Sequence, residues 1–323
     1  MTDIHRTRHT ITVDAPARTV YDLIAHATDW PRVFPPTVHV ERTDDGDSPD
    51  SGASAELITI WATANDEVKK WTSRRELDPE ALTVGFRQRV SQPPVASMGG
   101  DWRIEPLTDA SCTVVLDHDF TAVDDAPENL AWIGQAVDRN SGTELARLKA
   151  SAEQAGRLGE LLLTFTDTVT AQGSAADVYE FIWRAEKWQE RLPHVARVAL
   201  TEEAPGIQTL EMDTVATDGS QHTTRSVRVG FEPHRIVYKQ LLVPALLTAH
   251  VGEWLLTETD AGLVIASKHT VVVKPEAAPK VLGPEATVAD ARAFLRKALG
   301  NNSLATMRHA KEFAEERGGV SVG

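Results

Sequence analysis

Several features that mark whole classes of protein are scarce in this 323-residue sequence. Its single cysteine, Cys112, excludes an intramolecular disulfide and a thiolate metal cluster. No apolar run approaches the roughly 18 residues that would cross a bilayer. No apolar run follows a basic segment at the N-terminus, so we expect no secretory signal and a cytoplasmic location. The 33 basic against 47 acidic residues argue against a general affinity for nucleic acid or an anionic membrane.

Sequence motifs of cofactor chemistry are missing as well. There is no nucleophile elbow, phosphate-binding glycine loop, dinucleotide fingerprint or zinc-type Cys/His set. Asp117-His118-Asp119 holds residue types that ligate metals. Neighbours on a strand point to opposite faces, however, so these three cannot readily share an ion. We therefore expect neither a cofactor nor a metal.

The sequence does contain an internal repeat. The segment Val20-Tyr21-Asp22-Leu23-Ile24 with Trp30 recurs, at the same spacing, as Val178-Tyr179-Glu180-Phe181-Ile182 with Trp188. Further matches keep their order along the chain: Leu77-Asp78-Pro79 with Phe231-Glu232-Pro233, Trp102 with Trp254, His118 with His269, and Asn140-Ser141 with Asn302-Ser303. Chance similarity would not preserve this order, so the sequence predicts a duplication with domains over 1–157 and 158–323.

Both copies have the same predicted order of elements. A strand (10–13; 163–169) precedes a short amphipathic helix, with Asp14 as the N-cap in the first copy and Ser174 in the second. Runs rich in Val, Ile, Thr and Trp predict an antiparallel meander, in the first copy around 55–63, 68–76, 82–90, 98–105 and 112–120. Helices over 126–153 and 286–317 close the copies. We predict an α+β fold of two tandem helix-grip (START-like) domains, each a curved antiparallel sheet around a long C-terminal helix with an internal pocket.

Polar residues on predicted inward faces indicate what lines this pocket. Trp71, Ser73, Arg75 and Leu77 alternate onto one face of a strand, and Trp71 and Leu77 make that face the candidate for the inside. Arg75 is then either functional, or structural through a carboxylate such as Asp117, or exposed. His118 shares an inward face with Leu116, and His269 with Ser267. Each histidine is either catalytic or a satisfied core residue.

The closing helices carry asparagines within apolar stripes. Leu130, Ile133, Val137, Asn140 and Leu148 recur at helical spacing, as do Ala291, Leu295, Ala298 and Asn302. A buried asparagine needs hydrogen-bond partners. Asn140 and Asn302 are therefore predicted on the core side, either as pocket residues or as structural ones.

Together these residues resemble a known family. The motifs similar to those of the polyketide aromatase/cyclases of bacterial type II synthases are Trp30-Pro31-Arg32-Val33-Phe34-Pro35, Trp71-x-Ser73-x-Arg75, Trp102 and Asn140-Ser141-x-Thr143. Two fused copies resemble the di-domain members. The resemblance implies a cofactor-independent enzyme acting on a C9-reduced poly-β-ketone held by an acyl carrier protein, with type II synthase components as partners. The implied reaction is C7–C12 first-ring closure and aromatisation by dehydration. The alternative is a non-catalytic START-like protein that binds a hydrophobic ligand.

The resemblance also implies roles for residues of the first copy. Arg75 would stabilise an oxyanion, and Ser73 would donate or relay a proton. Single-domain relatives place a tyrosine after the Trp-Pro motif, where this chain has Pro36-Thr37, so His118 is the substitute proton donor. The residues expected to bind substrate are Trp30, Trp71, Trp102 and Asn140.

The second copy departs from this pattern. Aligned without a gap through its Glu-Pro turn, it places Arg225 at the position of Trp71, and Val227 and Val229 at those of Ser73 and Arg75. A one-residue shift would place Ser226 and Arg228 there instead, but it would turn the valines outward. We prefer the ungapped register. It predicts Arg225 and His269 as catalytic residues and Trp188, Trp254 and Asn302 as substrate-binding ones.

Overall fold

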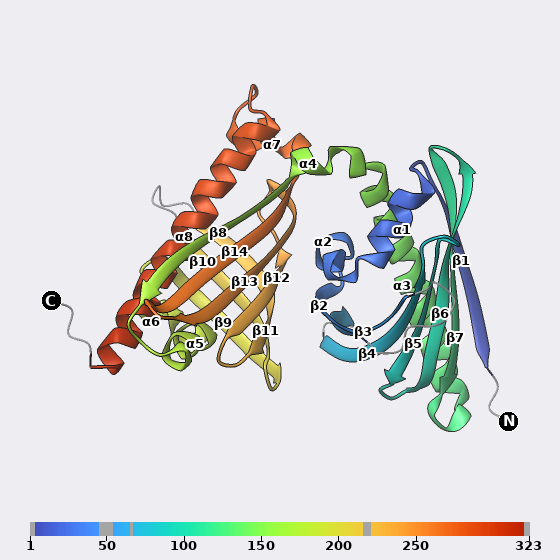
Figure 1. The fold of residues 1–323 in the computed structure, drawn as a ribbon, viewed down its shortest axis with the longest axis horizontal. Helices are drawn as coiled ribbons and strands as arrows, with labels where there is room; N and C mark the ends of the chain where they lie inside the picture. Colours follow the sequence, from blue (N-terminus) through green and yellow to red (C-terminus); the bar gives the residue numbers. More distant parts are fainter. Residues whose placement is uncertain (1–3, 45–53, 65–66, 216–220, 320–323) are drawn as a thin grey trace. The chain divides into compact units, whose positions relative to one another are not determined.

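The computed structural model describes residues 4–44, 54–64, 67–215 and 221–319. The chain divides into two compact units, residues 1–157 and 158–323 (Figure 1). Each unit has a seven-stranded antiparallel sheet and a long C-terminal helix. The predicted α+β fold of two tandem helix-grip domains is confirmed.

The first unit begins with a strand, passes through short helices into the meander, and ends on the long helix α3. Its elements are β1 (His5–Val13), α1 (Ala17–Ala25), η1 (Ala27–Asp29), α2 (Trp30–Val33), β2 (Thr37–Asp44), β3 (Ser54–Ala64), β4 (Glu67–Asp78), β5 (Thr83–Val90), β6 (Val95–Thr108), β7 (Ser111–Ala122), η2 (Val123–Asp125), α3 (Pro127–Glu153) and η3 (Ala155–Arg157). The sheet order is β1-β7-β6-β5-β4-β3-β2. Every strand predicted in this copy is present, and β2 is an additional one.

The second unit repeats this plan and ends on α8. Its elements are α4 (Leu158–Leu161), β8 (Leu162–Ala171), α5 (Ala175–Trp183), η4 (Ala185–Lys187), α6 (Trp188–Arg191), β9 (Val195–Ala204), β10 (Ile207–Val215), β11 (Gln221–Phe231), β12 (Arg235–Leu242), β13 (Leu247–Thr259), β14 (Gly262–Val273), η5 (Pro275–Ala277), α7 (Ala278–Leu282) and α8 (Val288–Arg317). The sheet order β8-β14-β13-β12-β11-β10-β9 matches that of the first unit strand for strand.

The first helix has a different N-cap in each copy. In α5 the Ser174 side chain accepts a hydrogen bond from the Asp177 backbone N–H, as predicted. The prediction of Asp14 as N-cap is wrong, because α1 begins only at Ala17, with Pro16 at the N-cap and no side-chain cap. The proline fixes the backbone at that position and leaves Asp14 outside the helix.

The closing helices are tied to their first strands by the same pair of contacts. Lys149 donates to the Thr12 carbonyl, and Glu153 accepts from the Asp14 backbone N–H at 3.0 Å. In the second unit Lys311 donates to the Thr170 carbonyl, and Glu315 accepts from the Gln172 backbone N–H at 2.8 Å. The duplication therefore extends to individual hydrogen bonds.

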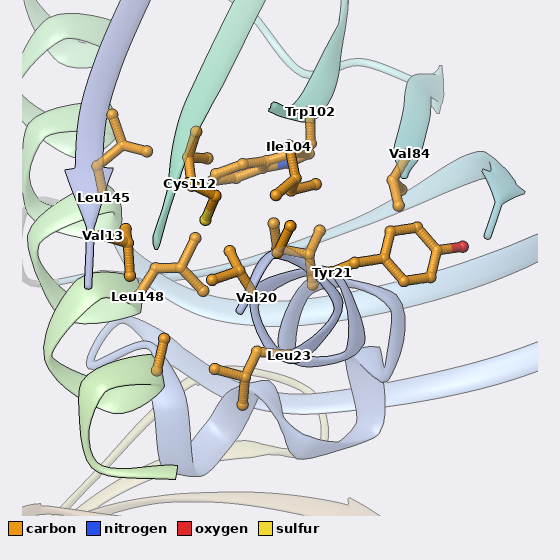
Figure 2. Packing of buried hydrophobic residues seen from close by; sticks show 14 of the residues in the cluster. Val13, Val20, Tyr21, Leu23, Val84, Trp102, Ile104, Cys112, Leu145 and Leu148 are labelled. Carbon is orange, nitrogen blue, oxygen red and sulfur yellow. The ribbon is translucent and has the colours of Figure 1, made fainter. Parts of the chain in front are cut away.

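The core of each unit lies between the sheet, the short first helix and the closing helix. In the first unit Val20 and Tyr21 of α1 pack with Trp102 of β6 and Leu148 of α3 (Figure 2). The equivalent cluster of the second unit includes Val178, Tyr179 and Trp254. Trp102 and Trp254 are thus core residues of their units.

The predicted inward position of the asparagines is wrong. The buried face of α3 holds Ile133, Val137, Ser141, Leu145 and Leu148, whereas Asn140 is exposed. Successive helix residues are about 100° apart, so the serine that follows the asparagine takes the inward position. In α8, likewise, Ser303 is buried and Asn302 is exposed. The repeated Asn-Ser pair marks the inner face through its serine.

Candidate functional site

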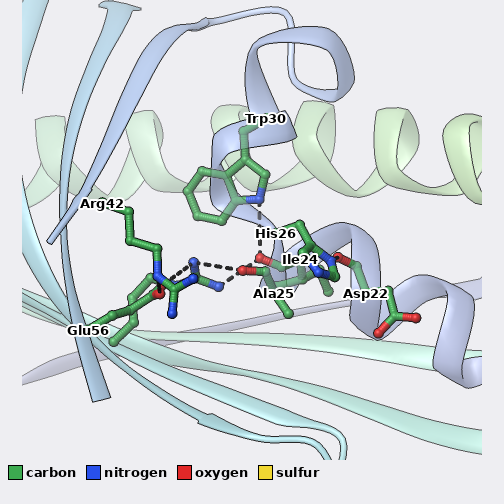
Figure 3. Close-up of polar contacts among 8 residues, drawn as sticks. Asp22, Ile24, Ala25, His26, Trp30, Arg42 and Glu56 are labelled. Carbon is green, nitrogen blue, oxygen red and sulfur yellow. Dashed lines mark hydrogen bonds and ion pairs between the residues drawn. The ribbon is translucent and has the colours of Figure 1, made fainter. Parts of the chain in front are cut away.

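A buried arginine organises the inner face of the first unit. Arg75 on β4 is 1% exposed. Its Nη1 donates to Glu56 Oε1 at 2.8 Å and to the Ala25 carbonyl at 3.2 Å, and its Nη2 donates to the Ile24 carbonyl at 2.7 Å. The guanidinium also lies 5.0 Å from the centre of the Trp30 ring. The Trp30 Nε1 donates to the same Ile24 carbonyl at 3.2 Å (Figure 3).

These contacts give Arg75 a structural task. Ile24 and Ala25 are the last residues of α1, where helix carbonyls lack partners within the helix. The arginine satisfies them and places a positive charge at the negative end of the helix dipole. Burial lowers the pKa of Arg75 to about 10, and Glu56 opposes this shift, so the guanidinium stays charged. The carboxylate partner of Arg75 is Glu56 rather than the suggested Asp117, which pairs with Arg8 and Arg103.

Arg228 is the counterpart of Arg75 in the second unit. Its Nη1 donates to Gln208 Oε1 at 3.0 Å and to the Trp183 carbonyl at 3.2 Å, and its Nη2 donates to the Ile182 carbonyl. The guanidinium lies 5.2 Å from the ring centres of both Trp183 and Trp188. The same contacts to the end of the short helix establish the equivalence.

The preferred ungapped register of the second copy is therefore wrong. Arg228 and Ser226 occupy the positions of Arg75 and Ser73, while Arg225 is exposed. The ungapped register was chosen because it places Val227 and Val229 in the interior. Both faces of β11 are buried here, however, so these valines and the alternating Arg228 are all buried. Burial of apolar residues cannot set the register of a strand that is covered on both sides.

The two arginines have partners of different charge. Strand pairing sets Glu56 opposite Arg75 and Gln208 opposite Arg228. Glu56 also forms an ion pair with Arg42, which joins three charges in the first unit. Gln208 is neutral, so the amide contact leaves the positive charge of Arg228 without a carboxylate among the partners in the described part of the chain.

Strand register places a histidine in the same cross-sheet row as each arginine. In the first unit the row runs Arg75, Phe86, Gly100, His118 and Thr7. In the second it runs Arg228, Tyr238, Gly252, His269 and Phe165. Cross-strand partners point to the same face of a sheet. The predicted equivalence of His118 with His269 is confirmed.

His118 has few polar partners. It is half-buried against Phe86, with ring centres 5.4 Å apart, and burial lowers its pKa to about 4. Its Nδ1 is buried with no hydrogen-bond partner among the described residues, as are Thr7 Oγ1 and His9 Nδ1 on the adjacent strand. Unpaired polar atoms are rare in protein interiors, so this part of the inner face is suited to a polar ligand.

His269 has a full set of partners. Its Nδ1 lies 3.2 Å from Tyr238 Oη and 3.0 Å from His250 Nε2, and its Nε2 lies 3.3 Å from Ser267 Oγ. Burial lowers the pKa of His250 to about 3 and that of His269 to about 4, so both rings are neutral at pH 7.

The remaining predicted site residues fall into two groups, one buried or half-buried and the other exposed. Ser73 is buried beside Arg75 on β4, and Trp71 is half-buried against the Ile58 and Ile60 cluster. Trp188 is buried, and its Nε1 donates to the Phe181 carbonyl at 3.1 Å, matching Trp30. Asn140, Arg225 and Asn302 lie away from these groups on exposed positions.

Sequence reasoning missed several inner-face residues. Glu56, Gln208, Tyr238 and His250 were not singled out, although a charged residue among the apolar positions of β3 is itself a signal. Glu144 on α3 was missed too; burial raises its pKa to about 7, so it exchanges protons near neutrality.

A separate hollow lies on the other face of the first sheet. Its volume is about 540 Å³, and its lining includes Arg87, Ser97, Asp119 and Thr121. Arg87 alternates with Phe86 along β5, so it points away from the arginine row. Among the described residues, no group of three His, Cys, Asp or Glu side chains could hold a metal ion. No helix in the described part of the chain is long and apolar enough to span a membrane.

The sequence matches two models described as polyketide cyclase / dehydrase and lipid transport, over residues 5–153 and 172–303. The granaticin polyketide synthase bifunctional cyclase/dehydratase of Streptomyces violaceoruber is 49% identical over 97% of this chain and 95% of its own. The actinorhodin polyketide synthase bifunctional cyclase/dehydratase of Streptomyces coelicolor is 48% identical over 95% of this chain and 96% of its own. The chain belongs to the polyketide cyclase/dehydratase family. The prediction that it is an enzyme is confirmed.

Solved structures of similar proteins share the two-unit architecture of this polyketide cyclase. The di-domain ARO/CYC BexL from the BE-7585A biosynthetic pathway superposes with a TM-score of 0.87 at 52% identity, over 96% of this chain and 99% of that one. The di-domain ARO/CYC StfQ from the steffimycin pathway gives a TM-score of 0.85 at 38% identity, over 97% and 100%. The predicted di-domain aromatase/cyclase resemblance is confirmed.

Proposed function

We propose that this polyketide cyclase closes the first ring of a poly-β-ketone chain held by an acyl carrier protein. The chain has its C9 carbonyl already reduced, ring closure joins C7 and C12, and loss of water makes the ring aromatic. The observation that carries the proposal is the repeated row of a buried arginine and a neutral histidine on the inner face of each sheet. Relatives named as bifunctional cyclase/dehydratases of granaticin and actinorhodin synthases support it.

The chemistry matches the residues. An intramolecular aldol reaction needs a carbonyl polarised as negative charge develops on its oxygen, and it needs proton transfer for the loss of water. Arg75 and Arg228 are held in place by helix-end carbonyls. Their positive charges are buried, where they stabilise developing negative charge more strongly than they would in water. Trp30 and Trp188 beside them present flat walls that hold a folded chain. Ser73 and Ser226 are buried two residues before these arginines on the same strands.

Reconstitution tests the proposed function. The protein is added to a minimal type II synthase with its ketoreductase, and the products are separated by chromatography and identified by mass and NMR. We expect an aromatic first ring only when the protein is present. An unchanged product mixture, together with tight binding of an aromatic product, would instead identify a non-catalytic carrier of hydrophobic ligands.

A further inference from the structure

The second unit holds a chain of hydrogen-bonding groups around His269. Tyr238 Oη and His250 Nε2 both contact its Nδ1, at 3.2 and 3.0 Å, and Ser267 Oγ contacts its Nε2 at 3.3 Å. His250, His269 and Ser267 are buried, whereas Tyr238 keeps accessible surface. Tyr238 is therefore the member of this group that keeps surface for contact with a bound molecule.

A glycine allows the phenol to reach the imidazole. Gly252 lies between Tyr238 and His269 in the strand register. A Cβ at this position would come within 2.2 Å of Tyr238 Cζ and Oη, so only a glycine lets the ring cross this strand. Phe165 stacks on His269 with ring centres 5.0 Å apart and fixes the plane of the imidazole.

The first unit has the same glycine and an aromatic ring at the equivalent positions, but it lacks the polar side chains. Phe86 stands in place of Tyr238, Met98 in place of His250, and Leu116 in place of Ser267, as the strand registers show. Gly100 is retained, and its Cβ would lie 2.8 Å from the ring of Phe86. The ring crosses the strand in both units, but only the second has a hydroxyl on it.

The surroundings suit transfer of a proton in both directions. A neutral imidazole has one donor and one acceptor nitrogen, so it can take up a proton on one contact while it donates on the other. Burial raises the pKa of Tyr238, and the positive charge of Arg228, its cross-strand neighbour, opposes that rise. Gln208 does not cancel this charge.

We propose that Tyr238 is the proton-transferring residue of the second unit and that His269 holds the proton between the two halves of dehydration. The carbon beside the substrate carbonyl gives its proton to Tyr238 Oη while the phenolic proton moves to His269 Nδ1, which leaves an enolate. Oη then gives a proton to the departing hydroxyl, the C–O bond breaks, water leaves, and His269 returns its proton to Oη. The net change is loss of one water.

This inference rests on the proposed function, and its test separates the two. Full-length Tyr238→Phe is compared with the wild-type chain and with the matched control Tyr21→Phe, which removes the same hydroxyl from a core residue of the first unit, in the reconstituted synthase. We expect Tyr238→Phe to lower the rate of aromatic product formation by about 100-fold or more, the usual range for a lost general acid–base group. A cyclised, hydroxyl-bearing intermediate should accumulate. Tyr21→Phe should keep the wild-type rate.

Two further measurements make the outcome unambiguous. Tyr238→Phe should keep the wild-type melting temperature and affinity for a dihydroxyanthraquinone, since the aromatic ring is retained. His250→Met, which copies the first unit, should also slow the reaction. Wild-type rates in both variants overturn the relay and leave the proposed function standing, whereas an inactive wild-type chain overturns the proposed function itself.

Discussion

At the scale of single residues, the two buried arginines show how the copies have diverged. Both bind the carbonyls at the end of a short helix, so both have a structural task. Arg75 also faces the buried carboxylate of Glu56, while Arg228 faces the amide of Gln208. Removing one partner of a buried ion pair leaves an uncompensated charge, whereas removing an arginine beside an amide does not.

Stability of matched variants tests this difference. Arg75→Met should lower the free energy of unfolding by about 3 kcal/mol, because Glu56 loses its buried partner and keeps only the exposed Arg42. Arg228→Met should lower it less, because Gln208 is uncharged. Urea unfolding of both full-length variants gives the comparison. An equal or larger loss for Arg228→Met would show that the partner's charge is not what distinguishes the two sites.

The register of β11 gives a prediction about activity. Arg228 points to the inner face and Arg225 is exposed. Arg228→Met should slow formation of the aromatic product by about 100-fold, the scale of losing one preorganised oxyanion partner. Arg225→Met is the matched control and should keep the wild-type rate. A slow Arg225→Met with a normal Arg228→Met would restore the rejected register.

At the scale of elements, the sequence predicted those features of the fold that a single physical cause determines. Alternation and turns located the meander, and the repeated order of landmarks located the duplication. The faces of α3 and α8 were misassigned by one residue, because Asn140 and Ser141 both fit the stripe of a loosely apolar helix. Of the relay residues, His269 was predicted from the repeat. Tyr238 could not be predicted, since its contact with His269 depends on Gly252 in a strand between them.

Helix capping offers a prediction at this scale. Ser174→Ala should lower the free energy of unfolding by about 1 kcal/mol, because the Asp177 N–H loses its acceptor. Asp14→Ala should change it little, since Asp14 lies before Pro16 and makes no cap hydrogen bond with its side chain. Chemical denaturation monitored by circular dichroism measures both. Equal losses would indicate that Asp14 caps α1 in solution.

At the scale of the whole molecule, the copies share a fold and differ in their inner faces. The second unit buries the pair His250 and His269, whose folded pKa values are about 3 and about 4. An unfolded histidine has a pKa of about 6.5. The unfolded chain therefore binds more protons below that pH, so stability is full above about pH 6.5 and falls as the pH drops toward 3.

His250→Met should make this acid sensitivity smaller. The variant removes one buried ring that must stay neutral in the folded state. The melting temperature should fall less between pH 7 and pH 4.5 than it does for the wild-type chain. His234→Met, at an exposed position, is the control and should leave the difference unchanged. A wild-type pH dependence in His250→Met would mean that this histidine is not held neutral by burial.

The central claim is that each copy of the duplicated fold forms its own binding site and that the two sites are not equivalent. Isothermal titration of the full-length chain with a dihydroxyanthraquinone, a stable fused-ring phenol, tests it directly. We predict two molecules bound per chain with different affinities, because Glu56, Phe86 and Met98 are replaced by Gln208, Tyr238 and His250. A stoichiometry of one, or two identical sites, would contradict it.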